Sequence, residues 1–408
     1  MRYLFVHQNF PGQFRHVAPA LAALGHEVVG LGVNKPAEPL KGVRHVLYRE
    51  PKDVLGKAEH PLGGALHGLH DKIMRGDMVA RAIEAIGKKG FSPEVVMAHS
   101  GWGEALFTRD ALPQARQLVY AEFYYGGAGS DTDFDPEFSR RSPLSEERVR
   151  VRNTHLLHAL SSCDAALTPT EFQKGRHPAW AQDRISAIHE GIDTTRFAPD
   201  ANAFVQLKSA GVTLKAGDEV VTFSVRQLEP YRGYHIFMRA LPLLQKLRPN
   251  AHVVLVGGDG TSYSANPPPG KTWRDMFLDE VRERLDMSRV HFVGRVPHGV
   301  LTQLMQVSAV HVYLTYPFVL SWSMLEAMSV GCLVLASDTE PVREVIEHGR
   351  NGLLTDFFDV ERLAHGIADA LGRRSELGHL RAAARATIVD RYDLATRCLP
   401  AQLAWLQR

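Results

Sequence analysis

Short apolar runs alternate with amphipathic stretches along most of the chain, and this alternation limits the fold more than any other feature of the sequence. The runs in the first half read YLFVHQ, HEVVGLGV, PEVVMAH, QLVYA and CDAALTPT. Apolar and polar residues do not alternate strictly within these runs, which is typical of parallel strands covered by helices on both faces. The pattern therefore predicts a doubly wound α/β domain.

The same alternation restarts in the second half. After a stretch rich in Pro, Asp and Asn, the runs EVVTFSVR, HVVLVGG, RVHFVGRV, AVHVYLT and CLVLAS follow. A chain of 408 residues is too long for one ordinary core. We expect doubly wound domains over residues 1–198 and 199–390, and a terminal helix over 391–408 that packs back toward the first domain. Ligands bind beyond the carboxyl ends of such strands, so two domains facing each other predict an interdomain cleft.

Composition excludes several classes of protein. The 47 basic and 45 acidic residues give a net charge of +2, which is no reason to expect nucleic acid binding. The three Cys lack CxxC spacing, so neither a disulfide framework nor a zinc site is indicated. We find no secretory signal pattern and no uninterrupted apolar run long enough for a membrane span. The expected location is the cytoplasm, with peripheral contact at the cytoplasmic face of the inner membrane left open.

Polar groups follow three strands of the first half. Gly12, after the first strand, would let backbone N–H groups approach a ligand, but HQNFPGQFRH is not GxGxxG and no acid ends the next strand, which disfavours a nicotinamide dehydrogenase. His99 ends PEVVMAH, and Glu122 follows QLVYA among aromatic residues. The structural alternatives are a tight turn at Gly12, a buried structural histidine at His99 and a salt bridge from Glu122 to a nearby arginine. The functional interpretation is a pair of groups that hold a substrate.

Two arginines mark the first strand of the second half. Arg226 ends that strand, and Arg232 precedes the next predicted helix. Guanidinium groups near a helix start suit a diphosphate because they bind phosphate oxygens in pairs, whereas surface ion pairs are the structural alternative.

The stretch FVLSWSMLE, residues 318–326, follows the strand AVHVYLT. Backbone N–H groups near Leu320 and Ser321 would then form a phosphate site at a helix start, and Glu326 would accept hydrogen bonds from a ribose diol. The next predicted helix starts near Pro341 and carries Glu344 in its first turn.

The motifs SVRQLEPYRGYH, VLVGGDG, HFVGRVP, SMLEAMSVGCLVLAS and PVREVIEHGRNGLL resemble, in this order, the nucleotide-binding half of the retaining glycosyltransferases of family 4. That family has the GT-B fold, in which two Rossmann-like doubly wound domains face an interdomain cleft. The first half, with HQNFPGQFRHVAPALAALGHEV, resembles a bacterial subgroup more loosely.

The resemblance assigns roles to particular positions. It implies catalytic roles for His99, Glu122, Arg226 and Arg232. It implies donor binding by Gly12, Arg226, Arg232, Gly257, Val296, Leu320, Ser321, Glu326 and Glu344. Acceptor binding is expected at Gln13, Trp102, Tyr124 and Arg152, and the neighbouring Arg140, Arg141, Arg148 and Arg150 would meet an anionic acceptor or form a solvated helix face.

The sequence also departs from the family pattern. The family has two Glu separated by seven residues; Glu326 matches the second, but Phe318 replaces the first, which touches the transferred sugar in the family. Arg232 stands where the family has Lys, and Glu122 where it usually has His. The resemblance therefore does not indicate which sugar the donor of this chain carries.

The resemblance implies transfer of a sugar from a nucleoside diphosphate donor to a hydroxyl of a glycan, lipid-linked or small-molecule acceptor, with retention at the anomeric carbon. Arginines and the helix start would stabilise the leaving diphosphate, so we expect neither a metal nor a cofactor, and we expect no Asp-x-Asp pair in the chain to hold a metal. Bacterial surface polysaccharide or lipopolysaccharide synthesis is the expected role. The alternatives are a GT-B epimerase or phosphorylase and a noncatalytic nucleotide-sugar-binding scaffold, and the oligomeric state stays open.

Overall fold

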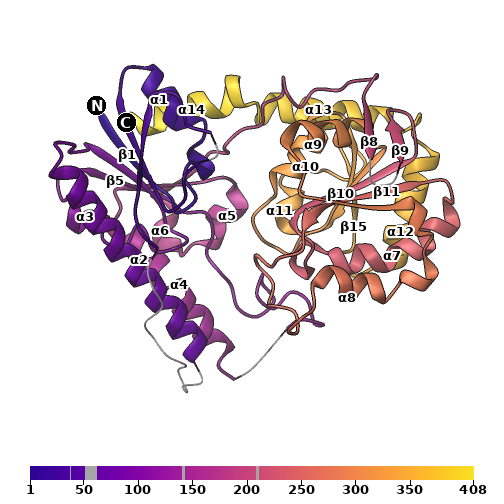
Figure 1. Cartoon of the computed structure of the whole chain (residues 1–408), viewed down its shortest axis with the longest axis horizontal. Helices are drawn as coiled ribbons and strands as arrows, with labels where there is room; N and C mark the ends of the chain where they lie inside the picture. Colours follow the sequence, from indigo (N-terminus) through magenta and orange to yellow (C-terminus); the bar gives the residue numbers. More distant parts are fainter. Residues whose placement is uncertain (37, 51–61, 140–142, 208–210) are drawn as a thin grey trace. The chain divides into compact units, whose positions relative to one another are not determined.

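The chain folds into two compact units (Figure 1), seen in a computed structural model that describes residues 1–36, 38–50, 62–139, 143–207 and 211–408. The first unit comprises Met1–Glu190 and Cys398–Arg408, and the second comprises Gly191–Arg397. The first unit thus ends before the predicted boundary at residue 198, and the chain returns to it at Cys398 rather than at 391. The reason is that Ile192 pairs with Asp393 and Phe197 packs in the core of the second unit.

The first unit is built on a parallel sheet of seven strands in the order β3-β2-β1-β4-β5-β6-β7. The strands are β1 (Arg2–Val6), β2 (Glu27–Gly32), β3 (Val43–Leu47), β4 (Val95–His99), β5 (Arg116–Tyr120), β6 (Ala165–Thr168) and β7 (Ile185–Ala187). The strand order reverses between β1 and β4. In open α/β sheets such a switch point is where ligands bind, beyond the carboxyl ends of the strands.

Helices cover both faces of this sheet, as the sequence pattern predicts. They are η1 (Gly12–Phe14), α1 (Val17–Ala23), α2 (Gly63–Gly87), α3 (Thr108–Ala111), α4 (Ser145–Ser162), α5 (Glu171–Arg176), α6 (Ala179–Gln182) and α14 (Leu399–Leu406). Alternate residues of β1 enter different cores. Tyr3 and Phe5 share one cluster with residues of α1 and α14, whereas Leu4 and Val6 share the other with residues of α2 and α4.

The second unit repeats this plan with six parallel strands in the order β12-β11-β10-β13-β14-β15. The strands are β10 (Val220–Gln227), β11 (His252–Gly258), β12 (Val290–Gly294), β13 (Val310–Tyr313), β14 (Leu333–Ser337) and β15 (Leu353–Thr355), and an antiparallel pair, β8 (Phe204–Leu207) and β9 (Val212–Lys215), precedes them. The switch point lies between β10 and β13. The prediction of two doubly wound units is confirmed.

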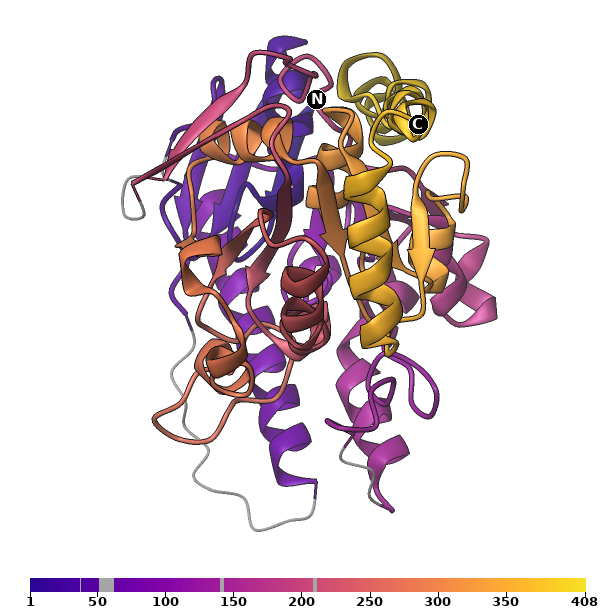
Figure 2. The same ribbon diagram turned by 90° about the vertical axis from the view of Figure 1, so that its right-hand side faces the viewer.

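Helices also flank this second sheet on both sides (Figures 1 and 2). One side carries α7 (Tyr234–Leu247), α8 (Trp273–Asp279) and α12 (Val360–Gly372). The other carries α9 (His298–Val307), α10 (Trp322–Ser329) and α13 (Gly378–Arg391). Shorter elements are η2 (Pro230–Arg232), η3 (Arg282–Arg284), η4 (Met287–Arg289), α11 (Glu340–Arg343) and the π-helical η5 (Leu394–Cys398).

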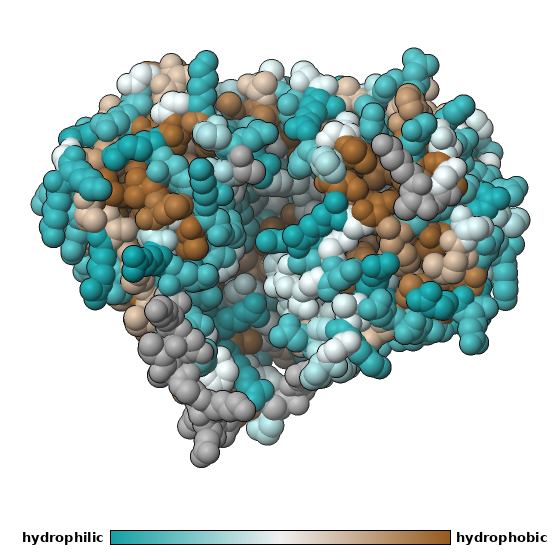
Figure 3. Space-filling view, viewed as in Figure 1, coloured by the Kyte–Doolittle hydropathy of each residue, from teal (hydrophilic) through white to brown (hydrophobic). Residues whose placement is uncertain are grey.

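The surface of the face in Figure 3 is mostly hydrophilic, with apolar patches scattered over each unit. The apolar runs of the sequence are accounted for by strands and helices buried within each unit. Among the helices of the described residues, none combines the length and hydropathy that a membrane span requires.

Candidate active site

The switch point of the first sheet gathers several of the predicted site residues. His7 directly follows β1, His99 ends β4, and Glu122 lies two residues beyond β5. Because these three strands are neighbours in the sheet, their carboxyl ends bring the side chains together. His99 and Glu122 are predicted from the sequence, whereas His7 is not, although its position at the end of the first strand is a usable signal.

A chain of polar contacts joins these residues. The Gln13 side-chain amide donates to Glu122 Oε1 at 2.8 Å, and Gln13 Oε1 lies 2.7 Å from His7 Nε2. The second carboxylate oxygen of Glu122 lies 3.6 Å from His99 Nε2. The Glu122 side chain remains 27% exposed, so the carboxylate is held by the protein and still open to a ligand.

Backbone hydrogen bonds assign the proton on both histidines. The Asn9 N–H donates to His7 Nδ1 at 2.9 Å, and the Gly101 N–H donates to His99 Nδ1 at 3.0 Å. Each neutral ring therefore carries its proton on Nε2, which His7 donates to Gln13 and His99 directs toward Glu122. Burial, followed by the neighbouring His99, holds the pKa of His7 well below its usual range, so His7 stays neutral at pH 7.

Close packing fixes both rings. Trp102 stacks on His99 with ring centroids 4.4 Å apart. Gly12 has a φ of +47°, and a Cβ there would lie 2.4 Å from His7 Nε2. Gly12 is not at the start of the following helix, because it lies in η1 and α1 begins only at Val17. Its lack of a side chain makes room for the His7 ring, and its role in donor binding stays a prediction.

The remaining predicted acceptor residues have local protein contacts. Arg152, on α4, places its guanidinium 3.4 Å from the centre of the Tyr125 ring, and the Tyr124 ring lies 6.0 Å from that of His177. Arg148 and Arg150 are exposed on α4, as a solvated helix face requires. Arg140 and Arg141 lie outside the described residues.

The expectation that the chain has no Asp-x-Asp pair is wrong. Residues 131–135 read DTDFD and contain this spacing twice. The carboxylates accept hydrogen bonds from within their own loop: Asp131 from the Gly126 N–H at 2.8 Å, Asp133 from the Ser139 hydroxyl, and Asp135 from the Glu137 N–H at 3.0 Å. These contacts give the acidic residues a role in shaping the loop. Because the chain contains the Asp-x-Asp spacing, its expected absence is no longer an argument against a metal.

In the second unit, Arg226 lies at the carboxyl end of β10, beside the switch point. Its side chain is exposed, and within the part of the chain that the structure describes it has neither an ion pair nor a hydrogen bond. An uncompensated guanidinium at this edge of a doubly wound sheet is suited to an anionic ligand.

Arg232 differs from the prediction of an open diphosphate contact. It is 6% exposed, and its Nη1 donates to Thr315 Oγ1 at 2.7 Å, to the Val319 carbonyl at 2.9 Å and to the Tyr313 hydroxyl at 3.2 Å. Burial by itself lowers its pKa, but neighbouring groups, led by Tyr313, outweigh that effect and raise it, so Arg232 stays charged. In this conformation Arg232 holds the segment between β13 and α10.

Phe318, which replaces the family carboxylate, belongs to an aromatic cluster. Its ring lies 4.9 Å from that of Tyr263 and 5.1 Å from that of Tyr231, and the Arg232 guanidinium lies 5.6 Å from its centre. Tyr263 reaches the cluster because Glu229 Oε2 accepts three backbone N–H groups, those of Ser262, Tyr263 and Ser264, at 2.9–3.1 Å. No local sequence pattern predicts this anchor, because the loop lies more than thirty residues from Glu229.

The start of α10 is organised by the protein itself. Ser321 is the N-cap, and its hydroxyl accepts the Ser323 N–H at 3.3 Å. The Ser321 N–H, predicted to bind a phosphate, instead donates to the Tyr313 hydroxyl at 2.8 Å. Leu320 is buried, and Glu326 lies in the second turn of the helix with 6% exposure.

Three further donor predictions find structural explanations. Gly257 allows strands to approach, since a Cβ there would lie 3.0 Å from the Val225 carbonyl oxygen. Val296 packs against an apolar cluster with Val293 and Val300. Glu344 is not in the first turn of a helix but at the C-cap of α11, because that helix already begins at Glu340.

Both halves of the chain match models of sugar-transferring families. Residues 24–197 match the glycosyl transferase family 4 group, and residues 206–387 match glycosyl transferases group 1. The chain is similar to the glycogen synthase of Mycobacterium tuberculosis H37Rv, with 23% identity over 97% of this chain and 92% of the relative. It is 25% identical, over 56% of this chain and 57% of the relative, to a GDP-mannose-dependent phosphatidylinositol monomannoside mannosyltransferase of Mycolicibacterium smegmatis.

Solved structures share the fold. Sucrose-phosphate synthase from Thermosynechococcus elongatus superimposes with a TM-score of 0.75 and 18% identity over 100% of this chain and 98% of its own. The Anabaena protein HepE, in complex with UDP and glucose, gives a TM-score of 0.68 and 18% identity over 100% of this chain and 99% of its own.

Proposed function

The chain belongs to the GT-B glycosyltransferases of the family 4 group, and from this premise we propose that it transfers a sugar from a nucleotide sugar to a hydroxyl acceptor, with retention at the anomeric carbon and without a metal. The observation that carries the proposal is the position of Arg226 at the switch point of the second sheet. Its guanidinium is exposed and has no partner among the residues that the structure describes. A leaving diphosphate needs such a charge.

The proposed reaction proceeds on one face of the sugar. The bond between the anomeric carbon and the diphosphate oxygen breaks, and the acceptor oxygen bonds to the same face of that carbon. The acceptor proton passes to the leaving phosphate oxygen, so no separate base is needed. Arg226 stabilises the charge on the diphosphate, and Glu326 holds the ribose.

The first unit supplies the polar groups for the sugar and the acceptor. Glu122, held by Gln13, would accept a hydroxyl hydrogen bond or stabilise positive charge on the anomeric carbon, and His99 would donate through Nε2. A covalent sugar on Glu122 is the alternative chemistry. Loss of transfer in Glu122→Gln with unchanged donor binding supports either role, and trapping of a sugar on the peptide that contains Glu122 would identify the covalent route.

The acceptor belongs to the cell envelope in this proposal. Its support is the relative whose name specifies a phosphatidylinositol mannoside, which is a lipid-linked acceptor. Peripheral contact with the cytoplasmic face of the membrane would follow from such an acceptor.

The test combines binding with turnover. UDP- and GDP-sugars are titrated into the wild type, Arg226→Ala and Glu326→Ala, and release of the nucleoside diphosphate is measured with and without envelope glycans or lipids. Binding of one base family that both substitutions weaken, together with acceptor-dependent release and an α-linked product from an α-linked donor, is the expected result. An inverted product would exclude retention, and a requirement for Mg²⁺ or Mn²⁺ would exclude the metal-independent reaction.

A noncatalytic nucleotide-sugar-binding protein is the second candidate. The observation in its favour is that Arg232 is buried and Phe318 occupies the place of the sugar-binding carboxylate. Donor binding without transfer or hydrolysis would favour this candidate, whereas donor turnover in the absence of any acceptor would favour an epimerase or a phosphorylase.

A further inference from the structure

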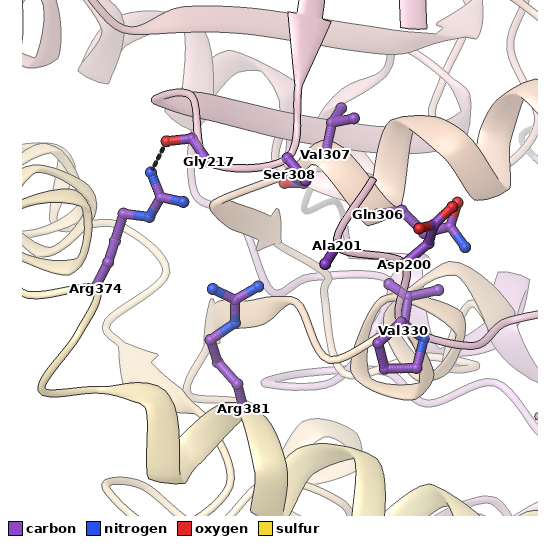
Figure 4. A pocket seen from close by; sticks show the side chains of 11 residues that line it. Asp200, Ala201, Gly217, Gln306, Val307, Ser308, Val330, Arg374 and Arg381 are labelled. Carbon is purple, nitrogen blue, oxygen red and sulfur yellow. Dashed lines mark hydrogen bonds between the residues drawn. The ribbon is translucent and has the colours of Figure 1, made fainter. Parts of the chain in front are cut away.

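A pocket of about 370 Å³ lies at the opposite edge of the second sheet, where the strands begin (Figure 4). It is formed by the turn before β10, the end of α9, the end of α10 and the first turn of α13. The polar side chains that line it are Asp200, Gln306, Ser308, Arg374 and Arg381. Its volume is that of a site for a small organic ligand.

Two arginines enter this pocket from the α12–α13 segment, and backbone carbonyls fix both of them. Arg374 donates through Nη1 to the carbonyls of Gly217 and Asp218, the latter at 3.1 Å. Arg381 donates through Nε to the Gly331 carbonyl at 2.7 Å. Figure 4 shows Arg381 directing its guanidinium into the space between Arg374 and the side formed by Gln306 and Asp200.

Each arginine retains donors that the described protein does not use. Nε and Nη2 of Arg374 and both terminal nitrogens of Arg381 make no hydrogen bond to the residues described, and neither side chain has an ion pair there. The guanidinium planes are thus held in place with free N–H groups. This preorganisation lowers the entropic cost of binding an oxyanion.

The charges in the pocket favour an anion. Burial and then the positive charge of Arg381 lower the pKa of Arg374, so the two groups repel each other. The acid in the lining, Asp200, accepts the Asn202 N–H at 2.8 Å and makes no ion pair with either arginine. Two positive groups therefore face one negative group, and a bound oxyanion would relieve the repulsion.

We propose that this pocket is a second ligand site, which binds the phosphate group of a small phosphorylated molecule between Arg374 and Arg381. It is separate from the donor site: Arg226 is six residues along β10 from Val220, a distance of roughly 20 Å at the rise of a strand. A ligand in this pocket therefore binds together with a nucleotide sugar and does not compete with it.

The test uses inorganic phosphate and glucose 6-phosphate as probes, with the full chain. Calorimetric titrations are made in the Arg226→Ala background, which suppresses phosphate binding at the donor site, at constant ionic strength with chloride as the control anion. Arg374→Gln and Arg381→Gln should each weaken phosphate binding roughly 10- to 100-fold. Arg373→Gln is the matched control, because Arg373 is exposed beside the pocket arginine and pairs with Glu376 at 2.8 Å.

A second measurement leaves the hydrogen bonds between the two arginines and the backbone carbonyls intact, which the glutamine substitutions remove. In the protein without pocket substitutions, the Nε–H resonances of Arg374 and Arg381 should shift on addition of phosphate, and that of Arg373 should not. Unchanged resonances, or phosphate binding that survives both glutamine substitutions, would show that the two arginines only satisfy backbone carbonyls. A larger effect of glucose 6-phosphate than of phosphate would show that the pocket also contacts the organic part.

Discussion

At the scale of single residues, the first unit combines a neutral histidine with a carboxylate. His7 is kept neutral by burial, and through Gln13 it orients Glu122 without a net charge of its own. His99 faces the other carboxylate oxygen. The carboxylate therefore accepts a hydrogen bond from Gln13 on one oxygen and faces His99 Nε2 at 3.6 Å with the other, which orients it and lets it respond to positive charge on a sugar.

Replacing Arg226 by Ala should weaken the binding of nucleoside diphosphates about 10- to 100-fold, because one charge-assisted contact to phosphate is lost. The melting temperature should stay nearly constant, since the side chain is exposed. Isothermal titration with UDP and GDP measures the first effect. Exposed Arg350, paired with Glu347 at 2.6 Å, gives a control substitution with no expected change in binding, and equal losses in both variants would contradict the assignment.

Gly12→Ala should reduce turnover much more than donor binding. The new Cβ would meet His7 Nε2 at 2.4 Å, and the backbone φ of +47° is strained for alanine. Displacement of His7 would release Gln13 and with it Glu122. The kcat and the donor Kd are measured together. Gly25→Ala, at a φ of +86° with no atom within 4 Å of the added Cβ, controls for backbone strain alone.

At the scale of elements, the buried carboxylate of Glu229 is the main anchor of the loop between β11 and α8, beside single hydrogen bonds such as that from the Tyr231 N–H to the Ser264 hydroxyl at 3.0 Å. Glu229→Ala would leave the N–H groups of Ser262, Tyr263 and Ser264 without their acceptor. These amides should exchange hydrogen about 10- to 100-fold faster, and unfolding should cost about 1–3 kcal/mol less. Hydrogen exchange followed by mass spectrometry reports both the loop and the distant strand β14, which should be unaffected.

The strands and the order of the motifs could be predicted from the sequence, whereas several local roles could not. Buried runs such as those around Val29 and Val254 are nearly continuous in apolar residues and are separated by amphipathic stretches, a pattern that the sequence alone displays. Arg232 was predicted as an open ligand contact because its partners, Thr315 and the Val319 carbonyl, lie more than eighty residues away. Glu344 was misplaced by one helical turn because the ends of a four-residue helix leave little pattern.

At the scale of the whole molecule, buried histidines make the protein sensitive to acid. Burial lowers the pKa of His155 and of His177 to about 4, from about 6.5 in an unfolded chain. The unfolded chain therefore binds more protons between pH 6.5 and 4. Stability should be full above pH 6.5 and fall as the pH is lowered toward 4, by up to about 3 kcal/mol for each histidine.

The measurement for this prediction is the melting temperature from pH 7.5 to 4.5. His177→Gln should reduce the slope of stability against pH by the contribution of about one proton. The reason is that it removes one group that is neutral in the folded protein and charged in the unfolded chain. Ser161→Ala is a control: Ser161 is exposed on α4 and carries no group that titrates between pH 4.5 and 7.5, so the slope should stay that of the wild type. A curve equally steep in His177→Gln and in the wild type would contradict the prediction.

Trp405→Ala should destabilise the first unit by about 3–5 kcal/mol. The indole is 3% exposed, packs in the cluster that contains Tyr3 and Phe14, and donates to Ser186 Oγ at 3.1 Å. Differential scanning calorimetry of the whole chain should show the loss, and hydrogen exchange should assign it to β1 and α1. Loss of protection in β13 and β14 instead would contradict a role confined to the first unit.

The first unit takes residues from both sides of the second unit in the sequence, and this order has a consequence for synthesis on the ribosome. Residues 191–397 emerge after Glu190 and before the segment Cys398–Arg408 that completes the first core. The second unit is contiguous, so its folding does not depend on residues 398–408. The first unit must wait, with the apolar surface that receives Trp405 and Leu406 uncovered, until residues 398–408 leave the exit tunnel. Chaperone contacts during translation are therefore expected on the unit that is made first, and they should persist longest there.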